Sequence, residues 1–271
     1  MRPALRAHAA ATLAVVERDA RLFLSYRLRP LMLLVGPVTT VTLFYYVSRL
    51  LNPAALGSAD GYFAYVVIGV VALGVLTAAL GTTPVALRQE LVAGTFERLV
   101  LSPFGAIRGL TAMMVFPVVQ ALFVATFTVI YAALVFGMEI SWPDALLAGP
   151  AALLGAIAFA PFGLLTIAGV MLVKQALGGV SILLTAMSIF AGVYFPVALL
   201  PDALRWVSEV QPFTPALDLL RGLVSSAPTT SEPWLDVAKL VGFTLVLFPL
   251  SLWALARSLD ISRRRGTIIE Y

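Results

Sequence analysis

The stretch 88–103 holds the residues best suited to specific recognition, and it reads Arg-Gln-Glu-Leu-Val-Ala-Gly-Thr-Phe-Glu-Arg-Leu-Val-Leu-Ser-Pro. Gly94 suits the left-handed conformation that ends many helices, and Thr95 can cap a following helix that has an acidic residue in its first turn. Ser102 and Pro103 repeat this pattern of a cap followed by a first-turn residue. The stretch therefore predicts two short helices separated by a sharp turn, an element that can dock into a groove on a soluble partner. Its charged residues are Arg88, Glu90, Glu97 and Arg98.

The residues that the sequence lacks exclude several kinds of catalytic, metal and nucleotide site. It has no cysteine and a single histidine, His8, so neither a thiolate nucleophile nor a histidine-based metal cluster can form. Neither of its two lysines, Lys174 and Lys239, follows the glycine that a Walker A loop requires. We therefore expect no catalytic residue, metal or cofactor in this chain, and any ATP and Mg²⁺ would be held by another subunit.

The composition indicates a membrane protein. Hydrophobic residues make up 61% of the 271 residues and charged residues 12%, whereas soluble domains average about 45–50% and about 25%. Runs of about 20 apolar residues are long enough to cross the hydrocarbon core of a bilayer. They predict six transmembrane helices at about 30–50, 61–87, 109–136, 145–173, 176–196 and 235–257. We expect an all-α membrane protein in which 30–258 is the transmembrane domain, preceded by the segment 1–29 and followed by the tail 259–271.

The basic residues predict the orientation of the chain. The N-terminus, the loop 88–108, the turn at Lys174 and the C-terminus together hold 14 of the 18 Lys and Arg residues. Because cytoplasmic loops carry an excess of these residues, both termini are expected in the cytoplasm. This asymmetry accounts for the net charge of +4 better than nucleic-acid binding does. The charged N-terminal segment 1–29 lacks the early apolar run of a cleavable signal peptide, so we expect none.

Two regions outside the spans are predicted to be helical. Residues 5–28 combine apolar residues at helical spacing with the pair Glu17 and Arg21, which is typical of an amphipathic helix lying on a membrane. The alternative is a solvated cytoplasmic tail. Residues 201–210 and 214–225 predict two short helices between spans five and six, forming an extracellular cap that dips into the bilayer edge. An ordinary ordered loop is the alternative there.

Aromatic residues gather at the predicted outer ends of spans one and five, namely Tyr45, Tyr46, Tyr194 and Phe195. Anchoring at the interface is one interpretation, and an outer gate or a sugar-stacking part of a translocation path is the other. The span centres carry no charged residue. That pattern disfavours transport coupled to protons or sodium and favours a path for an apolar or amphipathic substrate.

The pattern Glu-x-x-x-Gly-Thr-x-Glu-x-Leu-x-x-Ser-Pro, starting at Glu90, resembles the cytoplasmic loop of ABC-2 type exporter permeases. Weaker likenesses are Glu17-Arg18-Asp19, the segment 200–206 and the segment 263–267, so that the resemblance covers nearly the whole chain. It implies a half-transporter that dimerises and binds two copies of a separate P-loop ATPase subunit. The contacts would come from Glu17 and Arg18 and from the coupling helix with Arg88, Glu90, Gly94, Thr95, Glu97, Arg98, Ser102 and Pro103.

The function that the resemblance implies is export, with this chain as the non-enzymatic permease. The cargo would be an amphipathic molecule, whether a lipid-linked glycan, a lipid or a hydrophobic drug, moved out across the bacterial plasma membrane by a homodimer. Phe96 and the Ile-Ile-Glu-Tyr tail leave the subfamily open. One alternative is an ATP-independent secondary transporter or channel, which would require an ionisable residue inside a span. Another is a membrane-bound enzyme or assembly factor, which would require clustered polar residues on one face.

Overall fold

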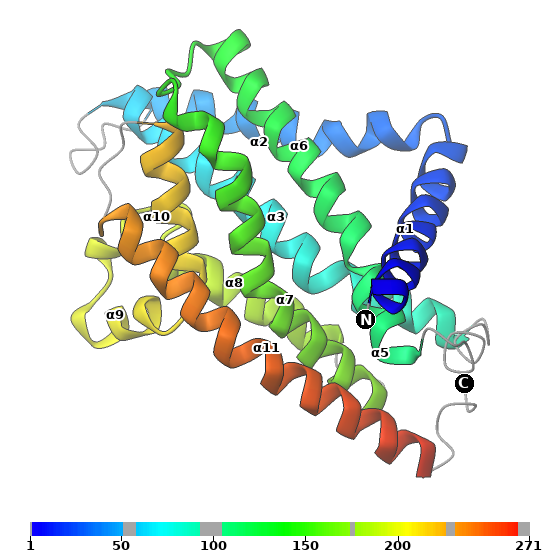
Figure 1. Ribbon diagram of the computed structural model, residues 1–271. Helices are drawn as coiled ribbons and strands as arrows, with labels where there is room; N and C mark the ends of the chain where they lie inside the picture. The colour runs from blue at the N-terminus through cyan, green and yellow to red at the C-terminus, as the bar shows by residue number, and fades with distance from the viewer. Residues whose placement is uncertain (1, 51–57, 93–104, 174–176, 226–230, 265–271) are drawn as a thin grey trace.

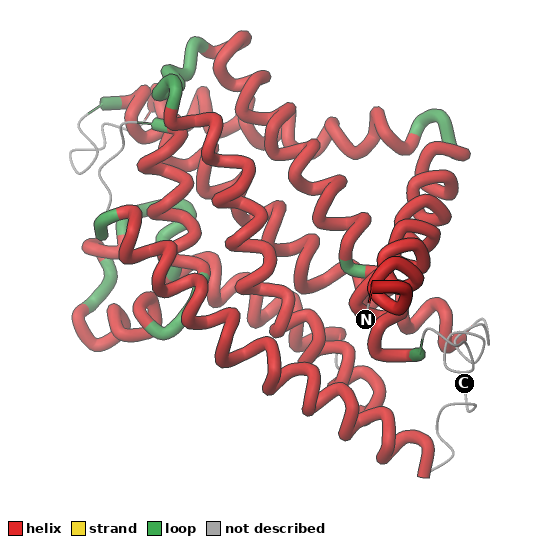
Figure 2. Tube along the Cα trace, in the orientation of Figure 1, coloured by secondary structure: helices red, strands yellow, loops and turns green. Residues whose placement is uncertain are grey.

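The computed structural model describes residues 2–50, 58–92, 105–173, 177–225 and 231–264. Over these ranges the chain is helical and contains no strand, in agreement with the all-α class that the sequence predicts. Figure 2 shows helix along almost the whole described chain, with short loops between the helices. The helices are α1 (Arg2–Ser25), α2 (Arg29–Leu50), α3 (Ala59–Val92), α5 (Ala106–Met113), α6 (Val115–Phe136), α7 (Ala148–Val173), α8 (Leu177–Phe190), α9 (Asp202–Glu209), α10 (Phe213–Val224) and α11 (Pro233–Arg264), with the 3-10 turns η2 (Asp144–Leu147) and η3 (Val197–Leu199).

The long helices are packed around α3 and α7, which are the most buried of them. α11 runs beside α7 along much of its length, and α3 contacts α2, α6, α7 and α10. Figure 1 shows that α1 begins and α11 ends at one end of the molecule, which we call the terminal end. α9 and α10 lie at the opposite end, which we call the outer end.

Five helices are long and apolar enough to cross a membrane in the described part of the chain. They are Arg29–Leu50, Ala59–Leu80, Ala106–Phe136, Asp144–Leu172 and Pro233–Ser262, and they match five of the six predicted spans closely. The sixth prediction, at 176–196, falls on α8, which ends at Phe190 and is shorter than a full span. The chain turns at Gly192, whose φ of +78° is a conformation that favours glycine. The six-span topology therefore stays a prediction.

The predicted helices outside the spans correspond to helices in the structure. α1 covers most of 5–28, and α9 and α10 fall within or beside 201–210 and 214–225. α9 is largely exposed, whereas α10 is buried against α3, α7 and α11. The placement of α1 on a membrane surface, and of α9 and α10 in an extracellular cap, stays a prediction.

Small residues allow the central helices to approach closely. This is usual in membranes, where helices associate through close packing because the hydrophobic effect does not drive them together. A Cβ atom added to Gly163 on α7 would lie 2.6 Å from the carbonyl oxygen of Ala79 and 2.9 Å from Met114 Cε. One added to Gly155 on the same helix would lie 3.2 Å from Ala216 Cβ on α10. The contact of α7 with α3 therefore depends on the missing side chain at Gly163.

We expect Gly163→Ala to destabilise the fold by about 1–3 kcal/mol, because the added methyl group overpacks a backbone contact that cannot shift freely. The measurement is thermal unfolding of the protein purified in detergent. Gly149→Ala, on the same helix, is the matched control because nothing lies within 4 Å of its added Cβ atom. Equal stability of the two variants would contradict this interpretation of the α3–α7 contact.

Candidate functional site

An apolar cluster at the terminal end holds together the helices that flank the predicted coupling segment. Its buried residues come from α3, α5, α7 and α11, and Val15 of α1 packs against it. They include Leu87, Ala106, Leu110, Leu164, Leu255 and Leu259. The end of α3, the start of α5 and the helix α1 are thus fixed relative to one another by a single core.

α1 packs on this end through some of its apolar residues, and its charged residues Glu17, Arg18 and Arg21 are exposed. The ring of Phe23 lies 5.9 Å from that of Phe116 on α6. Glu17 pairs with Arg21, and Arg18 pairs with Asp19 at 2.9 Å. Since these ion pairs are exposed, they contribute little to stability. Glu17 and Arg18 are both exposed, and their contact with an ATPase subunit stays a prediction.

The predicted coupling residues are only partly within the described structure. Arg88 is exposed in the last turns of α3, and Glu90 also lies in α3. α3 ends at Val92 and α5 begins at Ala106, both at the terminal end (Figure 1). The remaining members of the set lie outside the described residues, namely Gly94, Thr95, Glu97, Arg98, Ser102 and Pro103. Their contact with a partner stays a prediction.

The aromatic residues predicted for an outer gate differ in burial, and the neighbours Tyr45 and Tyr46 on α2 face different directions. Tyr45 packs inward, with its ring 4.5 Å from Phe136 and 5.5 Å from Phe63. Tyr46, the next residue, is 62% exposed. Tyr194 stacks on Phe44 of α2 at 6.1 Å, and Phe195 lies half-buried beside it in the turn after α8. Tyr45 is therefore a packing residue, while Tyr46 has the exposure that a gate or an interfacial anchor requires.

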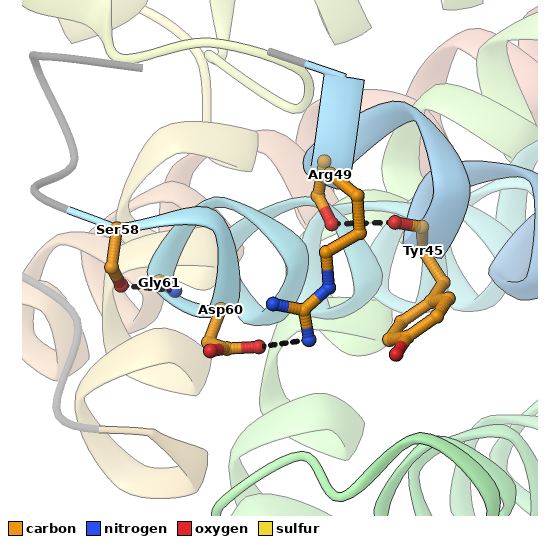
Figure 3. A network of polar contacts seen from close by, with 6 residues as sticks. Tyr45, Arg49, Ser58, Asp60 and Gly61 are labelled. Atoms are coloured by element: carbon orange, nitrogen blue, oxygen red, sulfur yellow. Dashed lines mark hydrogen bonds and ion pairs between the residues drawn. The ribbon is translucent and has the colours of Figure 1, made fainter. Parts of the chain in front are cut away.

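A polar network lies beside Tyr45 where α2 ends and α3 begins. Arg49 pairs with Asp60 at 2.7 Å, and its guanidinium carbon lies 4.9 Å from the centre of the Tyr45 ring. The Ser58 hydroxyl accepts a hydrogen bond from the Gly61 amide at 2.9 Å and so caps α3. Figure 3 shows Arg49 reaching from α2 to Asp60 with the Tyr45 ring next to its guanidinium group. This network connects the outer ends of α2 and α3.

A buried arginine lies in α10 and is not among the site residues predicted from the sequence. Arg221 falls within the helix predicted at 214–225, and 1% of its surface is exposed. Its guanidinium carbon lies 3.4 Å from the centre of the Tyr65 ring, and its Nη2 donates to the carbonyl oxygens of Gly192 at 2.9 Å and Val193 at 3.2 Å. Burial lowers the pKa of Arg221, and the nearby Tyr65 and Asp218 oppose this shift.

One signal in the sequence points to the buried position of Arg221. It is the one cation of the segment Phe213–Val224, whose other residues are mostly apolar apart from Asp218. An arginine in that setting needs a partner that offsets its desolvation. The partners here are backbone carbonyls and an aromatic ring, and neither can be recognised from the spacing of charged residues in the sequence.

Comparison with known proteins identifies the chain's relatives at the level of family. The model of the ABC-2 type transporter family matches residues 10–224, which extends from α1 through α10. A search of curated proteins found no match. The matched region includes the stretch 88–103, whose pattern resembles the permeases of this type.

Tyr45→Ala and Tyr46→Ala provide a test of the two roles assigned to these neighbouring rings. We expect Tyr45→Ala to lower the free energy of unfolding by about 1–3 kcal/mol, in the range of typical destabilising substitutions, because it removes contacts with Phe63 and Phe136. Tyr46→Ala should leave stability unchanged because its side chain is exposed. Thermal unfolding in detergent measures both, and a larger loss for Tyr46→Ala would refute the assignment.

Proposed function

Because the chain belongs to the ABC-2 type transporter family, we propose that it is the permease subunit of an ATP-driven exporter. In this proposal it works as a homodimer with two copies of a separate P-loop ATPase, in the plasma membrane of a bacterium and with both termini in the cytoplasm. ATP and Mg²⁺ are held by the ATPase, and this chain provides the path for the substrate. The observation that carries the proposal is the family match over residues 10–224.

The positions of the lysines and of the other charged residues support an energy source outside this chain. Its two lysines do not occur in a Walker A loop. Along the five membrane-length helices, the charged residues lie near helix ends, as Arg49, Asp60 and Arg108 do. Ion-coupled transporters place ionisable groups within the membrane. ATP hydrolysis by a partner therefore accounts for transport better than a proton or sodium gradient does.

The ATPase docks, in this proposal, on the terminal end. Glu17 and Arg18 on α1 and Arg88 near the end of α3 are exposed, and the apolar cluster at the terminal end holds these helices together. A displacement of the coupling segment would pass directly into α3. This arrangement suits the coupling role that the resemblance implies for 88–103.

The substrate we propose is amphipathic, such as a lipid-linked glycan, a lipid or a hydrophobic drug. The exposed faces of α2 and α6 are largely apolar and include Leu43, Tyr46, Phe123 and Leu134. A charged solute would find no matching group along these helices, whereas an acyl chain would pack against them. Exposed aromatic rings near the outer end, such as Tyr46, would suit a sugar or an interfacial headgroup.

A pull-down of the tagged permease from its native membrane in mild detergent should recover a P-loop ATPase in stoichiometric amount. The physical reason is that the chain cannot bind ATP through a P-loop of its own. The copurifying proteins are identified by mass spectrometry, with and without crosslinking. Recovery of the permease alone under both conditions would favour the ATP-independent transporter or channel instead.

Glu90→Arg and Gly94→Pro should each remove the ATPase from this complex while the permease still inserts into the membrane. Glu90→Arg reverses a charge in the coupling segment, and Gly94→Pro prevents the left-handed conformation expected there, since proline fixes φ near −65°. The ratio of ATPase to permease in the pull-down is the measurement. Glu139→Arg makes the same charge reversal at an exposed outer-end position and is the control. An unchanged ratio in both test variants would void the coupling role of 88–103.

A further inference from the structure

The turn after α8 is a break in an apolar helix that exposes backbone carbonyls inside the protein. α8 ends at Phe190, and Ala191, Gly192 and Val193 are all buried. Residues at a helix end leave carbonyl oxygens without intrahelical partners. In a membrane protein such groups must be satisfied internally, because the hydrocarbon offers no water. The partners of Gly192 and Val193 therefore decide whether the turn is stable.

Those partners come from two other helices. Tyr65 of α3 donates its hydroxyl hydrogen to the Gly192 carbonyl oxygen at 2.9 Å, and the guanidinium group of Arg221 on α10 donates to the Gly192 and Val193 oxygens. Arg221 also stacks on the Tyr65 ring. One buried contact thus joins α3, the turn after α8 and α10, and we call Tyr65, Gly192, Val193 and Arg221 the arginine clamp.

The backbone of α3 is shaped to fit the arginine clamp. A Cβ atom at Gly69 would collide with the Val193 carbonyl oxygen and would lie 3.1 Å from Arg221 Nη2. Gly74, five residues further along α3, has nothing within 4 Å of its added Cβ atom. α3 is thus in direct backbone contact with the turn at Gly69.

Burying the Arg221 cation in the arginine clamp costs free energy of desolvation. Arg221 is almost fully buried, its Nε has no hydrogen-bond partner, and no carboxylate forms an ion pair with it among the described residues. Its direct partners are backbone carbonyls and an aromatic ring, and the buried Asp218 adds a charge attraction without forming an ion pair. A buried cation held in this way is a poor source of stability, although such groups can specify one arrangement of their neighbours. Arginine suits this task because its planar fork can donate to two carbonyls while its face stacks on an aromatic ring.

We propose that Arg221 is a positioning residue that couples movement of α3 to movement of the turn after α8 and of the outer end. α3 extends for 34 residues from Ala59 to Val92, so one continuous helix connects the arginine clamp to the start of the proposed coupling segment. Movement of its terminal end would be carried through Tyr65 and Arg221 to the turn after α8, and from there to η3 and α9. This inference rests on the proposed function, since the ATPase subunit supplies the movement.

The experiment reports the state of the outer end without requiring the substrate. The chain has no native cysteine, so Leu199→Cys in η3, where the side chain is 62% exposed, provides a single reporter thiol. The permease is purified with its ATPase in lipid nanodiscs, and the rate of labelling by a water-soluble maleimide is compared without nucleotide and with ATP plus vanadate. We expect the two rates to differ, and we expect Arg221→Met to abolish the difference while the ATPase remains bound.

Matched variants separate coupling from general damage. Arg205→Gln is the control, because Arg205 also donates to backbone carbonyls, those of Leu200 and Ala198, but does not contact α3 through those bonds; it should keep the difference in labelling rate. Gly69→Ala should abolish the difference and Gly74→Ala should keep it. Should Arg221→Met fail to assemble, Tyr65→Phe decides the question, because it removes only the hydroxyl group that donates to Gly192.

The outcomes distinguish this inference from the proposed function. A full nucleotide-dependent difference in assembled Arg221→Met, or in Tyr65→Phe and Gly69→Ala, would overturn the role of the arginine clamp. A bound ATPase whose nucleotide leaves the labelling rate unchanged in the parent protein would overturn the clamp alone. Absence of an ATPase from the parent preparation would overturn both.

Discussion

The hydrogen-bonding needs of backbone groups inside an apolar body constrain this structure more than any other factor. Unbroken helices meet those needs within themselves, which is why α2, α3, α6, α7 and α11 dominate the fold. Wherever the chain departs from a helix among buried residues, other side chains must reach the freed carbonyls. The turn after α8 is the clearest case, since its carbonyls are bound by a tyrosine and an arginine that lie far away in the sequence.

The two ends of the molecule are stabilised in different ways. At the terminal end, an apolar cluster unites α1, α3, α5, α7 and α11 around residues such as Leu87 and Leu110. At the outer end, the larger apolar core also contains aromatic packing around Tyr45 and the buried charge of Arg221. α7 contributes several residues to each cluster, whereas α3 contributes mainly to the larger core and adds Leu87 to the terminal cluster. These two helices connect the two ends, and Gly163 lies where they meet.

The sequence predicted those parts of the structure that depend on the local run of residues. Five predicted spans overlap membrane-length helices over most of their length, because a membrane helix is defined by its own apolar length. The span at 176–196 stays a prediction: its residues remain apolar through the turn, but α8 ends at Phe190 and the chain turns at Gly192, whose partners are distant in the sequence. Arg221 was missed for the same reason, as its contacts with α3 have no local signal. Tyr45 and Tyr46 looked equivalent in sequence, yet neighbouring positions on a helix face different directions. The residues 94–103, which carry the family pattern, lie outside the described structure, so sequence alone supports their role.

The length of α3 has a mechanical consequence. At 1.5 Å per residue its 34 residues extend for about 50 Å, whereas the hydrocarbon core is only about 30 Å thick. In a membrane it therefore either tilts or extends beyond this core, and Pro84 lies between the arginine clamp and the end of the helix at Val92. Proline cannot donate to the carbonyl four residues earlier, here that of Leu80, so the helix is softest at this point. In the proposed transporter, bending at Pro84 would lower the fraction of a displacement at Val92 that arrives at the other end of α3.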